Sequence, residues 1–154
     1  MSENIEESTR RVIVTHVEKV VLVQSVDEAA RQPFQRQVRL DLDTQPGREV
    51  EGEASLEVPP GKRLVIEYIT AVPDRGWPES FPRLSIKTTV SSNTVSYPLI
   101  LKAGHKDETR VEQLMRIYAD AGKTVAFHAH VGTQPETPLE GIEFSLSGYL
   151  IDIK

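Results

Sequence analysis

The stretch QVRLDLD, residues 37–43, decides the fold class because apolar and polar side chains alternate strictly along it. In an extended chain the apolar side chains Val38, Leu40 and Leu42 face one side, and the charged side chains between them face the other. This period of two indicates a β-strand with one buried face. The segment VEGEASLEV, residues 50–58, repeats the alternation after the turn TQPGRE. The two segments therefore predict a pair of half-buried strands.

Further strands are predicted on both sides of this pair, separated by turns rich in Pro, Gly and Asn. Pro98 favours an edge position or a bulge for the strand that contains it, because proline cannot donate a backbone hydrogen bond. In RLVIEYITAV, a period of two places four side chains on one face: Leu64, Ile66, Tyr68 and Thr70. The predicted strands are RRVIVTHVEKVVLVQSV (10–26, one long strand or two), RLVIEYITAV (63–72), RLSIKTTV (83–90), TVSYPLILK (94–102), TVAFHAHV (124–131) and IEFSLSGYLIDI (142–153).

One stretch, DETRVEQLMRIYADAG at 107–122, fits two secondary structures. As a helix it has apolar residues at helical spacing, a capping aspartate at its start and a glycine at its end. The apolar residues in question are Val111, Leu114, Met115 and Tyr118. As a strand, QLMRIYAD turns through AGK into TVAFHAHV. The family resemblance given below favours the strand.

These patterns predict an all-β fold with eight or nine strands and at most one short helix. Such a set points to an antiparallel two-sheet sandwich of the jelly-roll type. Residues 1–9 are polar and acidic, and we expect them to form a flexible N-terminal tail. A chain of 154 residues has the length of one domain, so residues 10–154 are expected to form a single β-sandwich domain.

Composition excludes several classes of function. The net charge is −5 and no Lys/Arg-rich run occurs, so nucleic acid is not an expected partner. The chain has no cysteine, no G-x-S-x-G motif and no Gly-rich phosphate loop, so we expect a non-enzymatic protein without a cofactor. Its apolar stretches are too short for a transmembrane helix. The N-terminus lacks the pattern of a secretory signal, which leads us to expect a cytoplasmic location.

Three segments resemble, as a set, those of small uncharacterised bacterial β-sandwich proteins. They are VPPGKRLVIEYITAV, RIYADAGKTVAF and FSLSGYLIDI, and they cover roughly a quarter of the 154 residues. In that family the middle segment is a strand, a turn and a strand, and the resemblance implies no particular activity. A further run, SLSGYL at 145–150, is similar to the last strand of the trimeric jelly rolls of the tumour-necrosis-factor and C1q type. In those proteins the final strands lie near the threefold contact.

The segment GKTVAFHAHVGTQPE resembles the first signature of cupins, jelly-roll proteins that bind metal. The resemblance implies a metal site at His128, His130 and Glu136. However, the spacing to Glu136 departs from the cupin pattern, and no histidine follows position 130 to supply a further ligand. Alternation also places both histidines opposite the apolar face of this strand. We therefore expect no metal, and instead two partly exposed histidines on a polar or intersubunit face.

The loop PDRGWPESFP, residues 73–82, is a candidate ligand site because it contains the only tryptophan. Trp77 can stack on a sugar ring, while Asp74, Arg75 and Glu79 can hydrogen-bond its hydroxyl groups. A lectin-like, carbohydrate-binding module is therefore one alternative function, with a glycan as partner. The structural alternative is that Trp77 packs over the end of the sandwich or against a neighbouring subunit.

The last strand predicts self-association. Tyr149, Ile151 and Ile153 lie on the face opposite Phe144, Leu146 and Leu150, so an isolated sandwich leaves one apolar set exposed to water. We expect the chain to bury this set against copies of itself, as a trimer or another closed ring, with His128 and His130 also at the interface. The leading hypothesis is a structural or assembly protein, acting alone or within a larger assembly.

Overall fold

The computed structural model describes residues 30–42, 47–74, 82–103, 109–132 and 140–154. The N-terminal tail and the strand predicted at 10–26 lie outside this part of the chain. Nine strands form in the described residues: β1 (Gln32–Asp41), β2 (Val50–Glu57), β3 (Lys62–Pro73), β4 (Arg83–Val90), β5 (Asn93–Leu99), β6 (Leu101–Ala103), β7 (Thr109–Ala119), β8 (Thr124–Val131) and β9 (Gly141–Asp152).

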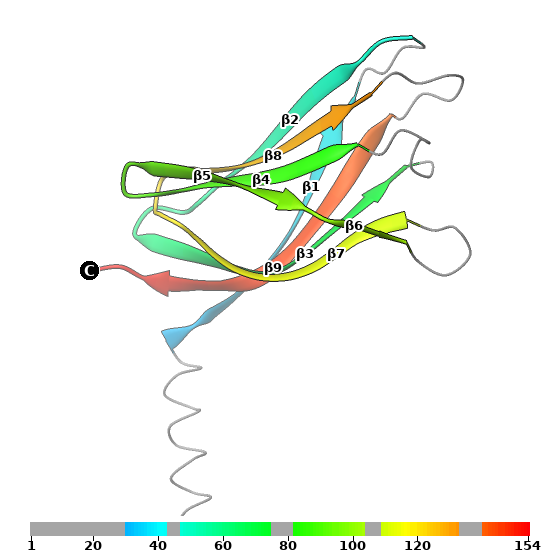
Figure 1. Cartoon of the computed structure of the whole chain (residues 1–154). Coiled ribbons are helices and arrows are strands. Elements are labelled where there is room, and N and C mark those ends of the chain that lie inside the picture. Colours follow the sequence, from blue (N-terminus) through cyan, green and yellow to red (C-terminus); the bar gives the residue numbers. More distant parts are fainter. Residues whose placement is uncertain (1–29, 43–46, 75–81, 104–108, 133–139) are drawn as a thin grey trace, which may run out of the picture. The chain divides into compact units, whose positions relative to one another are not determined.

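The strands form two sheets that pack face to face (Figure 1). A five-stranded sheet has the order β1-β9-β3-β7-β6, and a four-stranded sheet has the order β2-β8-β4-β5. The strands β1 to β4 enter the two sheets alternately, which gives the interleaved order of a jelly roll. The predicted all-β fold, an antiparallel two-sheet sandwich, is confirmed.

The hydrophobic core lies between the two sheets and is formed by the inward-facing side of each strand. In β8, every second residue from Val125 to Val131 is fully buried, as the alternation predicted. The rings of Phe127 and Phe144 meet with their centroids 5.0 Å apart, so they join the four-stranded sheet to the five-stranded one. Aromatic contacts of this kind add about 0.5–1.5 kcal/mol to the stabilisation from burial alone.

Residues 109–119 form strand β7, so the strand interpretation of this ambiguous stretch is confirmed. β7 pairs with β3 along most of its length and then turns at Gly122, whose φ of 68° suits glycine. The helical spacing was misleading, because Leu114 and Met115 point to opposite faces. Leu114 is 81% exposed, whereas Met115 packs against the core.

The expected face of β3 is wrong beyond Ile66. A β-bulge between Ile66 and Tyr68 inserts an extra residue, so Ile69 faces the core while Tyr68 and Thr70 face outward. On β9, Gly148 lies opposite this bulge. A Cβ atom on Gly148 would lie 1.9 Å from the backbone oxygen of Val65, so only glycine fits there.

Two further details concern the edges of the sheets. β1 begins at Gln32, earlier than the predicted start at 37. Strand pairing uses backbone hydrogen bonds, so β1 can pair with β9 where its side chains do not alternate between apolar and polar. β5 is an edge strand of the four-stranded sheet, as Pro98 predicted. After Ile100 the same run of chain joins the five-stranded sheet as β6.

Candidate functional site

The residues predicted to form the interface between copies lie on two opposite outer faces of the sandwich. His128 and His130 point outward from β8 in the four-stranded sheet. Tyr149 and Ile151 point outward from β9 in the five-stranded sheet. The structure therefore does not bring the predicted interface residues together, and one flat contact surface cannot include both sets.

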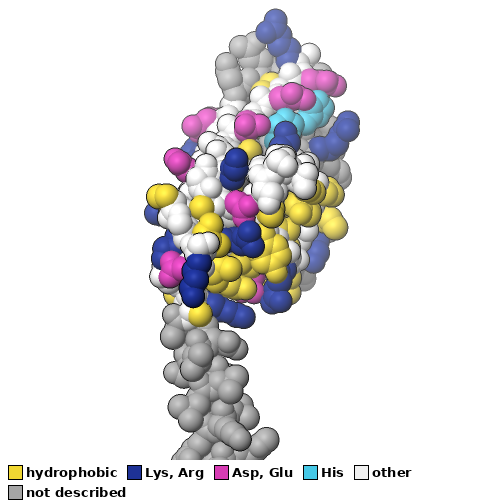
Figure 2. Space-filling view, turned by 90° about the vertical axis from the view of Figure 1, so that its left-hand side faces the viewer, with side chains coloured by type: hydrophobic (Ala, Val, Ile, Leu, Met, Phe, Trp, Pro, Cys, Tyr) yellow, Lys and Arg dark blue, Asp and Glu magenta, His cyan; other side chains and the backbone are white. Residues whose placement is uncertain are grey.

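The two histidines lie beside glutamates on the outer face of the four-stranded sheet (Figure 2). Nε2 of His130 lies 3.6 Å from a carboxylate oxygen of Glu49, and Nε2 of His128 lies 4.0 Å from one of Glu51. The histidine side chains are 24% and 27% exposed, respectively. They line a groove of about 530 Å³ with Arg83. When protonated, each histidine can form an ion pair with its glutamate.

The described residues give no support to the metal site that was the predicted alternative. Within the described ranges, no three His, Asp or Glu side chains come close enough together to hold a metal ion. Glu136, the third ligand of the cupin-like alternative, lies outside the described residues.

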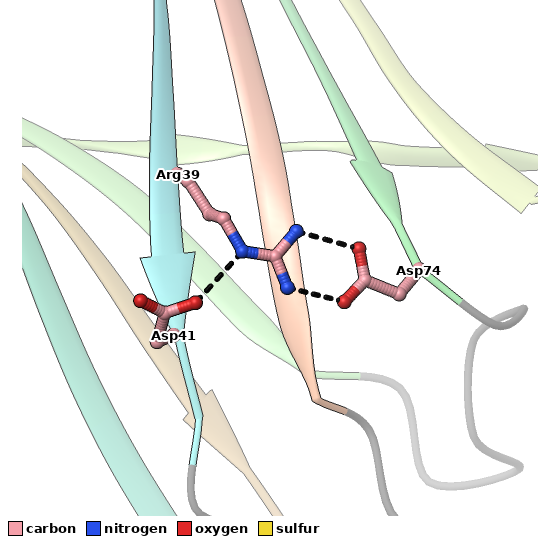
Figure 3. A network of polar contacts seen from close by, with 3 residues as sticks. All are labelled: Arg39, Asp41 and Asp74. Carbon is pink, nitrogen blue, oxygen red and sulfur yellow. Dashed lines mark hydrogen bonds and ion pairs between the residues drawn. The ribbon is translucent and has the colours of Figure 1, made fainter.

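Only one of the predicted glycan-binding residues of the 73–82 loop is described. Asp74 lies just after β3, whereas Arg75, Trp77 and Glu79 fall outside the described residues. The carboxylate of Asp74 accepts two hydrogen bonds from the guanidinium of Arg39, at 2.9 and 2.6 Å (Figure 3). Asp74 therefore has a structural contact of its own, which fixes the point where the loop leaves β3.

Arg39 forms the centre of this polar network at the edge of the five-stranded sheet (Figure 3). Its Nε also donates to Asp41 at 2.7 Å, and the hydrogen bonds that it donates to Asp74 and Asp41 raise the pKa of the guanidinium above its ordinary value. The side chain reaches Asp74 by passing over Gly141, where a Cβ would lie 2.8 Å from Nη2. The network thus connects the ends of β1 and β3 across β9.

The outer face of the five-stranded sheet carries an apolar surface that includes the predicted residues of β9. Val65 faces outward on β3 between Tyr118 and Tyr149, its register partners, and is fully buried although it lies outside the core between the sheets. Leu114, Tyr118 and Ile153 are 81%, 41% and 40% exposed. We call this surface the outer patch, and it consists of Val65, Leu114, Tyr118, Tyr149, Ile151 and Ile153.

Charged side chains on the same face form ion pairs across or along the strands. The pairs are Arg63–Asp120 at 2.8 Å, Arg116–Glu67 at 3.2 Å and Arg110–Glu112 at 3.2 Å. Each pair joins one positive to one negative group. The outer patch therefore lies among charges that largely neutralise one another.

Two titratable groups on this face have shifted pKa values. Asp120 accepts hydrogen bonds from the backbone N–H of Ser91 at 2.6 Å and from Arg63 at 2.8 Å, and these contacts lower its pKa. The hydroxyl of Tyr68 donates to Glu112 at 2.9 Å, which raises the pKa of Tyr68. Both contacts hold neighbouring strands or turns in fixed positions.

The sequence patterns did not predict Val65, Leu114 and Tyr118 as members of this surface. A signal for two of them exists in RVEQLMRIYA, where Leu114 and Tyr118 fall on the same face once the stretch is taken as a strand. The helical spacing grouped them with core residues instead. Val65 carries no such signal, because a buried valine in a strand normally belongs to the core.

Comparison of the chain with models of known protein families and with curated protein sequences found no match. No helix in the described residues combines the length and the hydrophobicity needed to cross a membrane.

Proposed function

We propose that the protein is a non-enzymatic building block that self-associates through the outer patch. The observation that carries this proposal is the exposure of Leu114. This residue lies in the middle of β7, on its outer face, and is 81% exposed. Leu114 lies on the same outer face of β7 as Tyr118, which neighbours Val65 and Tyr149 across the sheet, and exposed apolar side chains gathered on one face are typical of contacts between proteins.

A second copy of this chain is the partner that fits the outer patch best. Each copy carries a net charge of −5, so two copies repel one another over most of their surfaces. The repulsion is weakest where acidic and basic groups already neutralise each other, as in the Arg63–Asp120 and Arg116–Glu67 pairs. The outer patch combines this local neutrality with exposed apolar area.

The assembly that we propose is a closed ring, with a trimer as the leading stoichiometry. The similarity of SLSGYL to the last strand of trimeric jelly rolls supports this stoichiometry, because that strand lies near their threefold contact. In this chain the same run belongs to β9, whose Tyr149 and Ile151 belong to the outer patch. The ring can act alone or as one part of a larger assembly.

Sedimentation velocity with the Leu114→Glu variant tests this proposal. We expect the wild-type chain to sediment as an oligomer at micromolar concentration, and the variant to sediment near the monomer mass of 17.2 kDa. A buried, unpaired carboxylate at an interface costs several kcal/mol, enough to dissociate a micromolar complex.

Val95→Glu is the matched control, because Val95 is also exposed, at 45%, but lies on β5 in the four-stranded sheet. This variant should remain oligomeric. A wild-type chain that is monomeric at micromolar concentration, or equal dissociation of both variants, would disprove assembly through the outer patch.

A further inference from the structure

A groove of about 400 Å³ that includes several polar side chains lies on the outer face of the five-stranded sheet, next to the outer patch. Strands β1, β3 and β9 line it. The bulge in β3 contributes to it directly, because it turns Tyr68 and Thr70 outward into the groove. The other polar lining residues are Gln35, Arg36, Gln37, Ser145 and Ser147.

Most polar side chains in this groove are available to a ligand. Gln35, Thr70, Ser145 and Ser147 form no side-chain hydrogen bond with any residue in the described part of the chain. On the same face, by contrast, the charged side chains of β3 and β7 are joined in ion pairs. The groove therefore presents donors and acceptors without a protein partner in a region where other polar groups are paired internally.

The chemistry of this lining selects a class of ligand. An amide or a hydroxyl group can both donate and accept hydrogen bonds, as can the hydroxyl groups of a sugar. Among the described residues that line the groove there is no carboxylate, and Arg36 is the one cation. The ring of Tyr68 adds an apolar surface, and its hydroxyl is held by Glu112, so the ring has a fixed orientation.

We propose that this groove binds a neutral saccharide. Its volume falls within the range of about 300–1,000 Å³ that is typical of small-molecule sites. The sugar's hydroxyl groups bond to Thr70, Ser145 and the amide of Gln35, and one face of a sugar ring packs on Tyr68. None of the described residues that line the groove belongs to the 73–82 segment, and the proposed site does not depend on self-association.

The test is a binding assay with an array of neutral di- to hexasaccharides of glucose, galactose and mannose. Saccharides that bind are then titrated by calorimetry against the wild-type chain and the Thr70→Val/Ser145→Ala double variant. Each substitution removes a hydroxyl group and keeps a similar volume. We expect at least a tenfold increase in Kd from the loss of two hydrogen bonds.

Three controls make every outcome decisive. Ser85→Ala removes a hydroxyl from the four-stranded sheet and should leave Kd unchanged. Leu114→Glu is assayed in parallel, so that self-association cannot hide the groove. Trp77→Ala separates the groove from the loop.

Loss of binding in Trp77→Ala but not in the double variant would place the site on the loop and overturn the proposal. Failure of both the wild-type chain and Leu114→Glu to bind any array saccharide would overturn it as well. Circular dichroism of the double variant shows whether its fold is intact. If that variant is unfolded, Gln35→Ala on the edge strand β1 replaces it, with the same expected direction.

Discussion

Asp120 stabilises three parts of the fold through one carboxylate. It lies in the turn between β7 and β8 and accepts a hydrogen bond from Ser91, in the turn between β4 and β5. It also accepts one from Arg63 on β3. Ser91 has a φ of 56°, a conformation that is uncommon for a residue with a side chain, and the carboxylate satisfies its backbone N–H.

The stabilisation from Asp120 should depend on pH. Its contacts favour the ionised form, so its pKa is lower in the folded chain than in the unfolded chain. The contribution is therefore fully present above about pH 4, the ordinary value for aspartate, and is lost as the pH falls through the lower folded-state value.

We predict that Asp120→Asn lowers the free energy of unfolding at neutral pH by about 1 kcal/mol, the typical net value of such hydrogen bonds. Urea denaturation at pH 7 and at about pH 2 measures the difference between variant and wild type. That difference should shrink at the lower pH, because protonation of the Asp120 carboxylate removes the charge that its contacts favour. An unchanged difference at the two pH values would contradict this account of Asp120.

Gly148 allows β3 and β9 to approach each other at the bulge. The bulge moves the backbone of β3 towards β9, and the position that a Cβ atom of residue 148 would occupy is only 1.9 Å from the carbonyl oxygen of Val65. Backbone atoms in the middle of a sheet cannot move aside as a side chain can. The fit of the two strands therefore requires glycine at this position.

Gly148→Ala should destabilise the chain by about 3 kcal/mol or more, at the upper end of the range for single substitutions. Gly52→Ala on β2 is the matched control, because the nearest atoms to its new Cβ are the side-chain ends of Leu42 and Leu40. These can shift, so we expect a loss of at most about 1–2 kcal/mol. Urea denaturation of both variants decides the matter, and a Gly148→Ala chain as stable as wild type would refute the strand geometry described here.

Alternation along the sequence predicted the strands whose pairing is regular. β2 and β8 show a strict period of two, and the structure confirms both their extent and their buried faces. In β3 the same rule fails after Ile66, because a bulge depends on the pairing with β7 and β9 and leaves no periodic signal. For β7, the spacing of the four apolar residues slightly favoured a helix, and it is their pairing partners in the sheet that make the stretch a strand.

The candidate surfaces were predictable in part for the same reason. Tyr149 and Ile151 were placed on an outward face from alternation within β9 alone. The position of the histidines relative to them was not predictable, because it depends on which sheet each strand enters. That assignment is a property of the jelly-roll topology, in which β8 and β9 follow each other in the chain but belong to different sheets.

The placement of the two sheets separates the histidines from the proposed contact between copies. We predict that the double variant His128→Ala/His130→Ala sediments like the wild-type chain, because both substitutions lie on the outer face of the four-stranded sheet. The comparison with Leu114→Glu is made at one protein concentration. Dissociation of the histidine variant would show that copies meet through the four-stranded sheet instead.

The run of chain from β5 to β6 has a consequence for how the domain unfolds. Residues 93–99 are bonded to β4 in one layer, and residues 101–103 are bonded to β7 in the other, with only Ile100 between them. Neither sheet can separate from the other without breaking the hydrogen bonds between β4 and β5 or those between β6 and β7. Heating should therefore melt both layers in a single cooperative transition, with no state in which one of them survives alone.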